Sequence, residues 1–231
     1  MQWFRLIWFW FFLAIAPLTL GSCKHRLSVT PQLATTSTPV ATPSVVTPSV
    51  ATPLTAPSPL GQASEAAIWS QLRQGRGYVI LFRHALAPGT GDPSNFRLED
   101  CSTQRNLSAA GRQQAVRMGE LLRQQNIVVS RVLSSQWCRC LETAHLMAVG
   151  TVEPFPALNS FFQDRSTERS QTEQLRQFIL ENRDNTGVVV MVTHQVNITA
   201  ISDVIPQSGA AIVLQASTSN QVEFVGQLAS P

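Results

Sequence analysis

Charge is scarce in this sequence, and lysine is almost absent. Charged residues make up 13% of the 231 residues, the formal net charge is +3, and Lys24 is the only lysine. Because no run of lysine or arginine is present, we expect no nucleic acid among the partners of this chain. Arginine carries most of the positive charge, and its planar guanidinium suits bidentate contacts with anions.

The segment 27–61 contains no charged residue and is rich in threonine, proline, serine, alanine and valine. Such a composition offers too little buried apolar surface to offset the entropy lost on ordering. We therefore predict an extended, disordered tether over 23–61. The remaining residues, 62–231, have the length of one ordinary folded domain.

The N-terminus has the pattern of a targeting segment. Arg5 supplies a positive charge, and the apolar segment Leu6–Leu20 follows it. This segment is short for a membrane-spanning helix but has the length of a signal-peptide core. The small residues directly before Cys23 resemble a bacterial lipobox. The sequence therefore predicts a lipoprotein signal peptide over 1–22 and lipidation of Cys23.

A lipid on Cys23 would anchor the domain to a membrane of the bacterial cell envelope, facing the periplasm or the exterior. A plain signal peptide or an uncleaved anchor is the alternative interpretation of the same segment. In each case the folded domain is expected outside the cytoplasm, where disulfides form readily.

Three further cysteines lie in the predicted domain, at Cys101, Cys138 and Cys140. Cys138 and Cys140 are two residues apart on an expected helix, so their side chains point to different faces. A disulfide from Cys101 to one of them would leave one thiol free. Three reduced, buried cysteines are the alternative, and the spacing matches no zinc-binding template.

Apolar runs and helical patterns alternate along 62–231. Ser64 and Ser108 are expected to cap helices, and Ser170 with Glu173 has the pattern of a capping box. We predict strands at 78–82, 131–134, 188–192, 211–214 and 222–225, and further helices at 137–148 and 196–204. This order predicts an α/β three-layer sandwich, with a mainly parallel central sheet and helices on both faces.

Two histidines follow the most apolar strands, His84 after 78–82 and His194 after 188–192. Ligands bind beyond the carboxyl ends of parallel strands, so both rings are expected at one site. Arg83 precedes His84, and Arg139 lies on the helix expected at 137–148. Two arginines would repel a metal cation, but they suit a tetrahedral dianion such as phosphate.

These residues occur in motifs that resemble the histidine phosphatase superfamily, which is also called phosphoglycerate mutase-like. Leu81-Phe82-Arg83-His84 resembles the family's Arg-His signature, and Val192-Thr193-His194 resembles its second histidine motif. Ser134-Ser135 with Arg139 and Thr143-Ala144 is similar to the second arginine motif. Arg105-Asn106-Leu107-Ser108 with Gly111 is similar to a segment of the small phosphohistidine-phosphatase-like branch.

The resemblance implies a metal-independent reaction in which His84 takes the phosphoryl group and water then releases it. Arg83, Arg139 and His194 would hold the phosphoryl oxygens, and no cofactor is implied. A backbone carbonyl would hold the second ring nitrogen of His84. The loop 85–106 is expected to shape the mouth of the pocket, where Gln104 or Arg105 would contact the substrate.

The sequence departs from the family's pattern near the expected proton donor. Asn159 stands where many members carry a glutamate that acts as the general acid, and an amide does not supply a proton. Other carboxylates that could replace it are Asp92, Asp100, Asp164 and Glu168, although each also fits a plain loop charge. In addition, Ala85 and Gln195 stand where the family often has glycine.

We therefore predict a phosphoric monoester hydrolase that acts outside the cytoplasm on a small phosphorylated substrate or a phosphoprotein. A missing acid favours leaving groups of low pKa, as in acyl phosphates and phosphoramidates. The alternative function is a non-catalytic lipoprotein that binds phosphate or another anion with the same fold. The sequence leaves the substrate and the oligomeric state open.

Overall fold

Two runs of aliphatic residues form the central strands, β1 (Tyr78–Arg83) and β4 (Val188–Thr193). Nearly every residue in them is buried, as expected for strands covered on both faces. The two strands pair in parallel, with Phe82 beside Val192 and Arg83 beside Thr193. Residues 64–231 are described by this computed structural model, so the predicted signal peptide, Cys23 and the whole tether lie outside the described residues.

Four further strands complete a six-stranded sheet with the order β3-β2-β4-β1-β5-β6. These strands are β2 (Val129–Ser134), β3 (Val152–Pro154), β5 (Ala211–Ala216) and β6 (Val222–Leu228). The pairs among β3, β2, β4 and β1 are parallel, whereas β5 and β6 are antiparallel to their neighbours. The predicted mainly parallel sheet is confirmed. β3 was not predicted, because its three residues carry no apolar run.

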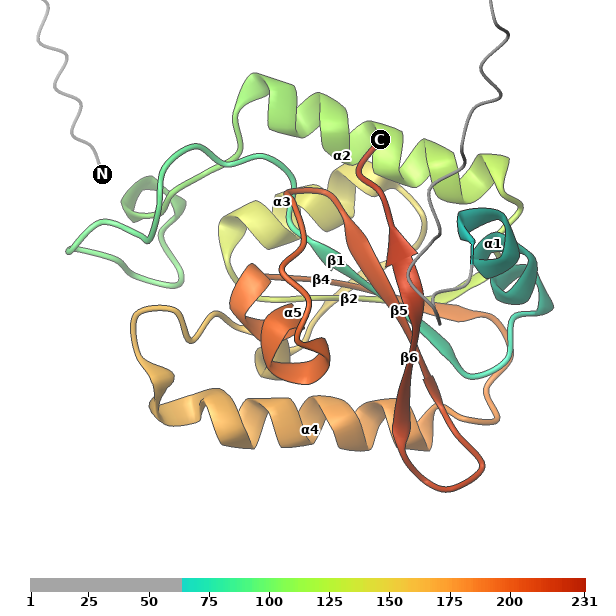
Figure 1. Ribbon diagram of the computed structural model, residues 1–231. Coiled ribbons are helices and arrows are strands. Elements are labelled where there is room, and N and C mark those ends of the chain that lie inside the picture. The colour runs from blue at the N-terminus through green and yellow to red at the C-terminus, as the bar shows by residue number, and fades with distance from the viewer. Residues whose placement is uncertain (1–63) are drawn as a thin grey trace, which may run out of the picture. The chain divides into compact units, whose positions relative to one another are not determined.

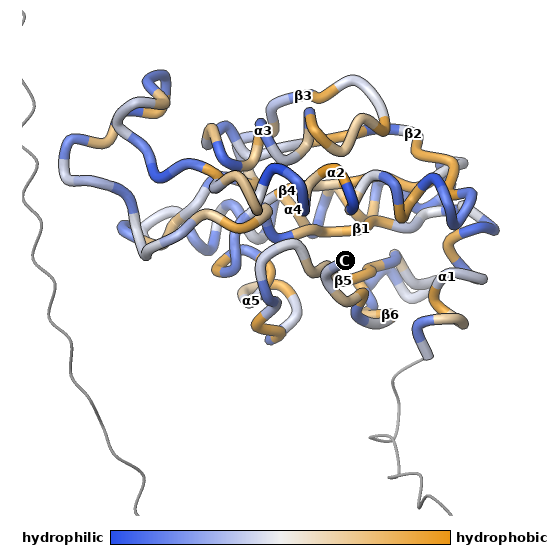
Figure 2. Tube along the Cα trace, turned by 90° about the horizontal axis from the view of Figure 1, so that it is seen from above, coloured by the Kyte–Doolittle hydropathy of each residue, from blue (hydrophilic) through white to orange (hydrophobic). Residues whose placement is uncertain are grey.

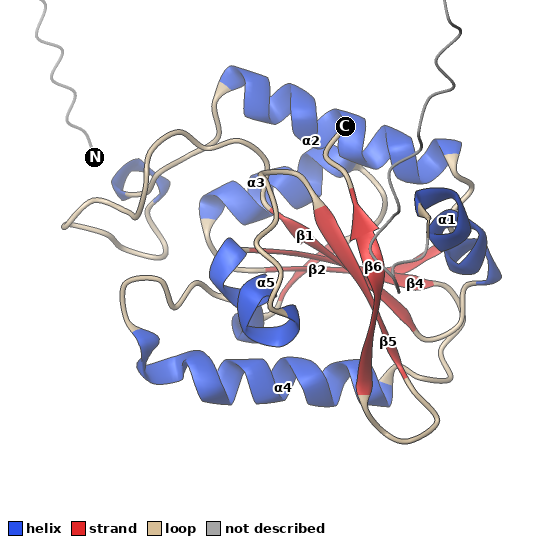
Figure 3. Ribbon diagram, viewed as in Figure 1, coloured by secondary structure: helices blue, strands red, loops and turns tan. Residues whose placement is uncertain are grey.

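Helices cover both faces of this sheet (Figure 1). One face carries α1 (Glu65–Gln74), α2 (Ala109–Gln124) and α3 (Cys138–Met147), and the other carries α4 (Glu168–Glu181) and α5 (Gln195–Ser202). Figure 3 shows the same layers as helix, strand and helix. The predicted three-layer α/β sandwich is therefore confirmed.

Alternate residues of each central strand serve the two cores. Ile80 and Phe82 pack with the core beneath α1, α2 and α3, whereas Val79 and Leu81 pack with the core beneath α4 and α5. Both sets are apolar because both faces of the sheet are covered. Figure 2 shows β1 as a largely apolar strand inside the molecule.

Serine caps begin two of the helices as predicted. The Ser64 hydroxyl accepts a hydrogen bond from the N–H of Ala67 at 3.3 Å, and α1 begins at the next residue. The Ser108 hydroxyl accepts from the N–H of Gly111 at 3.0 Å at the start of α2. Each bond satisfies a backbone donor that the first helical turn leaves free.

The capping box predicted at Ser170 and Glu173 is wrong, because α4 has already begun at Glu168. A 3₁₀ turn at Arg165–Thr167 runs directly into the helix, and the side chain of Asp164 caps that turn. The Ser170 hydroxyl therefore lies inside α4, where it donates to the carbonyl of Thr167 at 3.0 Å.

Two more 3₁₀ turns connect the elements, at Cys101–Thr103 and at Pro156–Leu158. No helix in the part of the chain from residue 64 onward is long and apolar enough to cross a bilayer.

Gly111 allows α2 to lie against the segment that follows β1. A Cβ atom at this position would overlap the carbonyl oxygen of Leu86. That oxygen also accepts hydrogen bonds from the backbone N–H and the hydroxyl of Ser108, at 3.1 and 3.2 Å. The glycine therefore helps to fix the chain two residues after His84.

We predict that Gly111→Ala lowers the free energy of unfolding by about 1–3 kcal/mol, the usual cost of overpacking. The gain in helix propensity from alanine, about 1 kcal/mol, offsets only part of this overlap. Urea denaturation would measure the loss. Gln113→Ala, at an exposed position of α2, is the matched control and should change stability by less than about 0.5 kcal/mol. Equal effects of the two variants would contradict the close approach at Gly111.

Candidate active site

The register between β1 and β4 brings His84 and His194 to the same edge of the sheet. His84 follows β1 directly, and its backbone N–H donates to the carbonyl of Thr193 at 2.9 Å. His194 follows β4, and the centroids of the two rings lie 5.5 Å apart. Both side chains are buried at the carboxyl ends of their strands.

A cavity of about 130 Å³ opens at this edge. Its lining includes the four predicted catalytic residues and the predicted contact residue Arg105 (Arg83, His84, Arg105, Arg139, His194). Asp92, Trp137, Phe162 and Gln195 also line it. The volume is small for a drug-sized ligand, so the cavity fits a phosphoryl group better than a whole large substrate.

The ring of His84 is held in one tautomer by its neighbour. Nδ1 lies 2.8 Å from the carbonyl oxygen of Ala85, and because a carbonyl only accepts, Nδ1 must carry the proton. Nε2 therefore has a free lone pair. Burial, followed by the positive charge of Arg139, lowers the pKa of His84 to about 3. His84 is thus neutral at physiological pH, as a ring that acts as a nucleophile must be.

His194 has the opposite tautomer. Its Nε2 lies 2.9 Å from the Ser135 hydroxyl, which in turn donates to Oδ1 of Asn159 at 3.3 Å. The hydroxyl has one proton to donate, so Nε2–H of His194 is the donor to Ser135. Nδ1 is left unprotonated, 3.4 Å from NH2 of Arg139. Burial, then Arg139, holds the pKa of His194 well below its usual value.

Arg83 and Arg105 extend the positive charge around the cavity. One Arg83 nitrogen donates to the carbonyl of Pro206 at 2.9 Å. The Arg105 guanidinium donates to the carbonyls of Ala87 and Gly91, which holds the loop after β1. Burial, followed by the charge of Arg139, lowers the pKa of each guanidinium. The mutual repulsion of three arginines makes this a favourable site for an anion.

Arg139 is almost fully buried near the start of α3 and pairs with Asp92. NH1 donates to Oδ1 at 2.7 Å, and NH2 donates to Oδ2 at 3.2 Å. Within residues 64–231, Nε of Arg139 and Nε of Arg83 have no hydrogen-bond partner. Buried donors of this kind are costly to leave unpaired, so they are suited to an anionic ligand.

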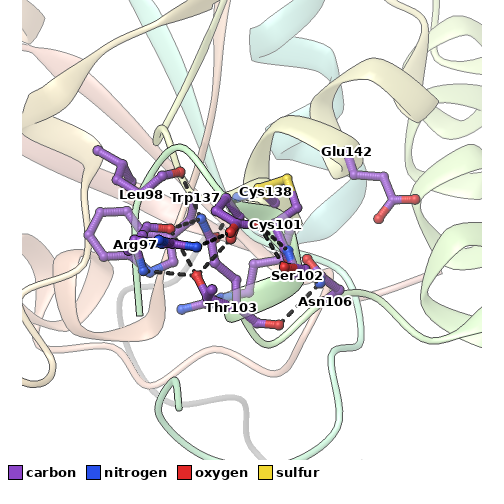
Figure 4. Close-up of a disulfide and its surroundings, with 12 residues drawn as sticks. Arg97, Leu98, Cys101, Ser102, Thr103, Asn106, Trp137, Cys138 and Glu142 are labelled. Atoms are coloured by element: carbon purple, nitrogen blue, oxygen red, sulfur yellow. Dashed lines mark hydrogen bonds and ion pairs between the residues drawn. A yellow bond between two sulfur atoms is a disulfide. The ribbon is translucent and has the colours of Figure 1, made fainter. Parts of the chain in front are cut away.

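A disulfide joins the loop after β1 to the start of α3 (Figure 4). It links Cys101 to Cys138, with the two Cα atoms 5.7 Å apart, and so settles which of the two proposed partners Cys101 takes. Cys140 is free and buried, and burial raises the pKa of its thiol to about 12. The disulfide lies one residue before Arg139 and therefore restrains the position of this arginine.

Gln104 lies beside the disulfide and is not among the residues that line the cavity. Its amide donates to the carbonyls of Arg97 and Leu98 and accepts from the N–H of Cys138. The structure thus places Arg105 at the cavity, but it uses Gln104 to connect the loop to α3. Because Gln104 and Arg105 are neighbours in the sequence, the sequence alone could not show which of the two side chains reaches the cavity.

The fold also shows which of the candidate proton donors lie at the cavity. Asn159 accepts from the N–H of Gln136 and donates to its side chain, so it holds the turn before α3. Asp100 pairs with Arg97, Asp164 caps a 3₁₀ turn and Glu168 pairs with Arg165, all away from the cavity. Asp92 alone of these carboxylates lines it.

The sequence indicated Asp92 only as a substitute acid and did not predict its pairing with Trp137 at the cavity. Trp137 donates from its indole N–H to Oδ2 of Asp92 at 3.0 Å, stacks on Phe96 and meets His194 edge to face. The available signal was the sequence Gly91-Asp92-Pro93, which reads equally well as an ordinary turn.

The two buried histidines predict a pH-dependent stability. Their folded pKa values lie below the unfolded value of about 6.5, so unfolding takes up protons as the pH falls from about 7 towards 4. Stability should fall over this range by up to about 1.4 kcal/mol per pH unit for each ring. Urea denaturation at pH 7 and pH 5 would measure it. His84→Asn should lessen this loss, and an unchanged slope would show that His84 is not held neutral.

Comparison with known proteins agrees with the fold. The model of the histidine phosphatase superfamily (branch 1) matches residues 79–177. No curated protein matches the chain. Among solved structures, the protein histidine phosphatase SixA complexed with tungstate is 16% identical, with 66% of this chain and 97% of that chain covered and a TM-score of 0.50. The open reading frame Rv3214 of Mycobacterium tuberculosis is 16% identical, with 66% and 97% covered and a TM-score of 0.51. The match over residues 79–177 and the shared fold together support the predicted resemblance to the histidine phosphatase superfamily.

Proposed function

We propose that this protein is a metal-independent phosphatase that forms a phosphohistidine on His84 and hydrolyses phosphoric monoesters outside the cytoplasm. One observation carries the proposal. His84, whose Nε2 has a free lone pair, lines a cavity around which Arg83, Arg105 and Arg139 gather. A neutral nucleophile among three guanidinium groups suits attack on a phosphoryl group and little else.

In the first step, Nε2 of His84 attacks phosphorus as the bond to the leaving oxygen breaks. The electron pair of that bond departs with the leaving group, and the arginines offset the charge on the phosphoryl oxygens. The Ala85 carbonyl stabilises the charge that develops on the ring, because Nδ1–H already donates to it. In the second step, water attacks phosphorus, the N–P bond breaks, and phosphate leaves.

His194 would contribute an N–H only after it takes up a proton at Nδ1. In the free protein burial and the arginines oppose that proton. A dianion in the cavity reverses the local charge and favours it. We propose that His194 then donates to a phosphoryl oxygen, with Ser135 and Asn159 holding the opposite edge of the ring.

Within residues 64–231, the cavity is lined by no carboxylic acid that is free to protonate a leaving group, which limits the substrates. Asn159 is engaged in backbone and side-chain hydrogen bonds, and Asp92 is an ion-paired carboxylate. A leaving group that departs with little protonation is therefore favoured, as in acyl phosphates, phosphoramidates and aryl phosphates. The small cavity would take the phosphoryl group of a small molecule or of a phosphoprotein.

A non-catalytic anion-binding protein is the second candidate. The observation in its favour is Asn159, which stands at the position of the family's glutamate and supplies no proton. The two candidates predict the same affinity for phosphate and differ in turnover.

Action outside the cytoplasm is supported by the disulfide between Cys101 and Cys138, because such bonds persist in oxidising compartments. The predicted lipid on Cys23 would hold the domain at a membrane of the cell envelope. A lipoprotein cysteine carries several acyl chains, which is more than one weakly binding chain provides.

We expect the purified full-length chain to hydrolyse a chromogenic aryl phosphate without added metal, with inhibition by vanadate. His84→Ala should lower kcat by at least about 1000-fold, because the nucleophile is lost. Rapid quench in alkaline detergent with phosphorus-labelled substrate would trap an alkali-stable, acid-labile phosphoryl group on the wild-type protein and none on the variant. Equal rates for the two proteins would refute the catalytic proposal, and retained phosphate binding would then support the anion-binding protein.

Lipid anchoring is tested by Cys23→Ala. The wild-type chain should sediment with membranes after expression in a bacterium and incorporate labelled fatty acid. The variant should lose the label, because no other residue is predicted to carry lipid. Cys140→Ala, which removes a buried thiol in the folded domain, is the control and should keep the label. A labelled Cys23→Ala variant would rule out this site of lipidation.

A further inference from the structure

Asp92 is a buried carboxylate in the loop between β1 and α2. Its side chain is only 4% exposed, yet it carries a full set of hydrogen bonds from N–H donors. Oδ1 accepts from NH1 of Arg139 and from the backbone N–H of Arg105, at 2.7 and 3.0 Å. Oδ2 accepts from NH2 of Arg139 and from the indole of Trp137, at 3.2 and 3.0 Å. The carboxylate is thus fixed from three sides.

Asp92 contacts one edge of the Arg139 guanidinium, formed by NH1 and NH2, and leaves the other edge, formed by Nε and NH2, without a carboxylate. The two terminal nitrogens, NH1 and NH2, face Asp92 end-on. Nε has no partner within residues 64–231, and NH2 also lies 3.4 Å from Nδ1 of His194. Along the edge formed by Nε and NH2, the contact with His194 is therefore the only one on the side away from Asp92 that residues 64–231 provide. Two parallel N–H groups of this kind match two oxygens of a phosphoryl group.

We infer that Asp92 is a positioning residue, which holds Arg139 so that its Nε–NH2 edge faces the phosphoryl group transferred to His84. The inference rests on the proposed phosphatase function and adds to it a residue that acts through Arg139. Asp92 acts by geometry and charge and does not touch the reacting atoms.

Electrostatics explains why Arg139 needs this partner. The side chain is buried beside the half-buried Arg83 and Arg105, whose charges repel it. A carboxylate in direct contact offsets that repulsion and the cost of burial. Three arginines and one carboxylate give the cavity a net charge of +2, which balances the two negative charges of a phosphoryl dianion.

The same contacts exclude Asp92 as the proton donor in this structure. Burial by itself would raise the pKa of Asp92, but hydrogen bonds from Arg139, Arg105 and Trp137 outweigh it and leave the pKa below its usual value. Its lone pairs are occupied by N–H donors, so the carboxylate stays ionised at neutral pH.

The test compares Asp92→Asn with Asp100→Asn in the full-length chain. Asp92→Asn keeps the shape but loses the charge and places an amide N–H against Arg139. We expect kcat/KM for an aryl phosphate to fall about 100-fold, the effect of a misplaced oxyanion donor. The inhibition constant for vanadate should rise by a similar factor. Asp100→Asn makes the same change in the same loop, at an exposed pair with Arg97, and should alter kcat/KM by less than about threefold.

A double variant separates positioning from general support of the fold. If Asp92 acts through Arg139, then adding Asp92→Asn to Arg139→Ala should lower kcat/KM by less than about threefold further. Asp92→Glu, which retains the charge, should recover part of the loss seen with Asp92→Asn. A further 100-fold loss in the Arg139→Ala background would overturn the inference, as would unchanged or increased activity of Asp92→Asn.

Vanadate binding, followed by calorimetry, keeps the inference separate from the proposed function. If the wild type shows no turnover that depends on His84, the phosphatase proposal fails. In that case weaker vanadate binding by Asp92→Asn than by wild type and Asp100→Asn would still support the positioning role. Equal affinities of the three proteins would refute it. If Asp92→Asn does not fold, the same comparison is made with Asp92→Glu. This variant should bind vanadate more weakly than wild type but more tightly than Arg139→Ala. Any other order of affinities refutes the role.

Discussion

Parallel pairing between β1 and β4 is the constraint on which the site depends. It aligns Arg83 with Thr193, so that His84 and His194 leave the sheet at the same edge with their rings 5.5 Å apart. The aliphatic residues of both strands are buried under helices on each face, which makes a shift of register costly. The stability of the central sheet thus sets the geometry of the two histidines.

A concentration of positive charge gives this edge its chemistry. Burial and Arg139 keep both imidazoles neutral, and backbone and side-chain partners select a different tautomer for each ring. The result is one ring with a free lone pair on Nε2 and one ring with an unprotonated Nδ1. The same positive charge that opposes protonation in the free protein favours a phosphoryl dianion in the cavity.

The loop between β1 and α2 connects these groups into one unit. Asp92 pairs with Arg139, Arg105 holds the loop carbonyls, and a disulfide from Cys101 ties the loop to the residue before Arg139. Gly111 allows α2 to pack against the start of the same loop. Rigid supports of this kind suit a site in which few groups must do the chemistry.

Local patterns in the sequence determined the fold class, the main strands, the serine caps at Ser64 and Ser108, and the identity of the residues at the strand ends. These features depend on burial periodicity and on neighbours a few residues apart. Tertiary structure alone decided that α4 begins at Glu168, that Cys101 pairs with Cys138, that Gln104 supports the loop, and that Asp92 meets Arg139. Asp92 and Arg139 are far apart in the chain, and an aspartate between glycine and proline looks the same in any turn. Only the path of the loop over the sheet edge brings the carboxylate to its partner.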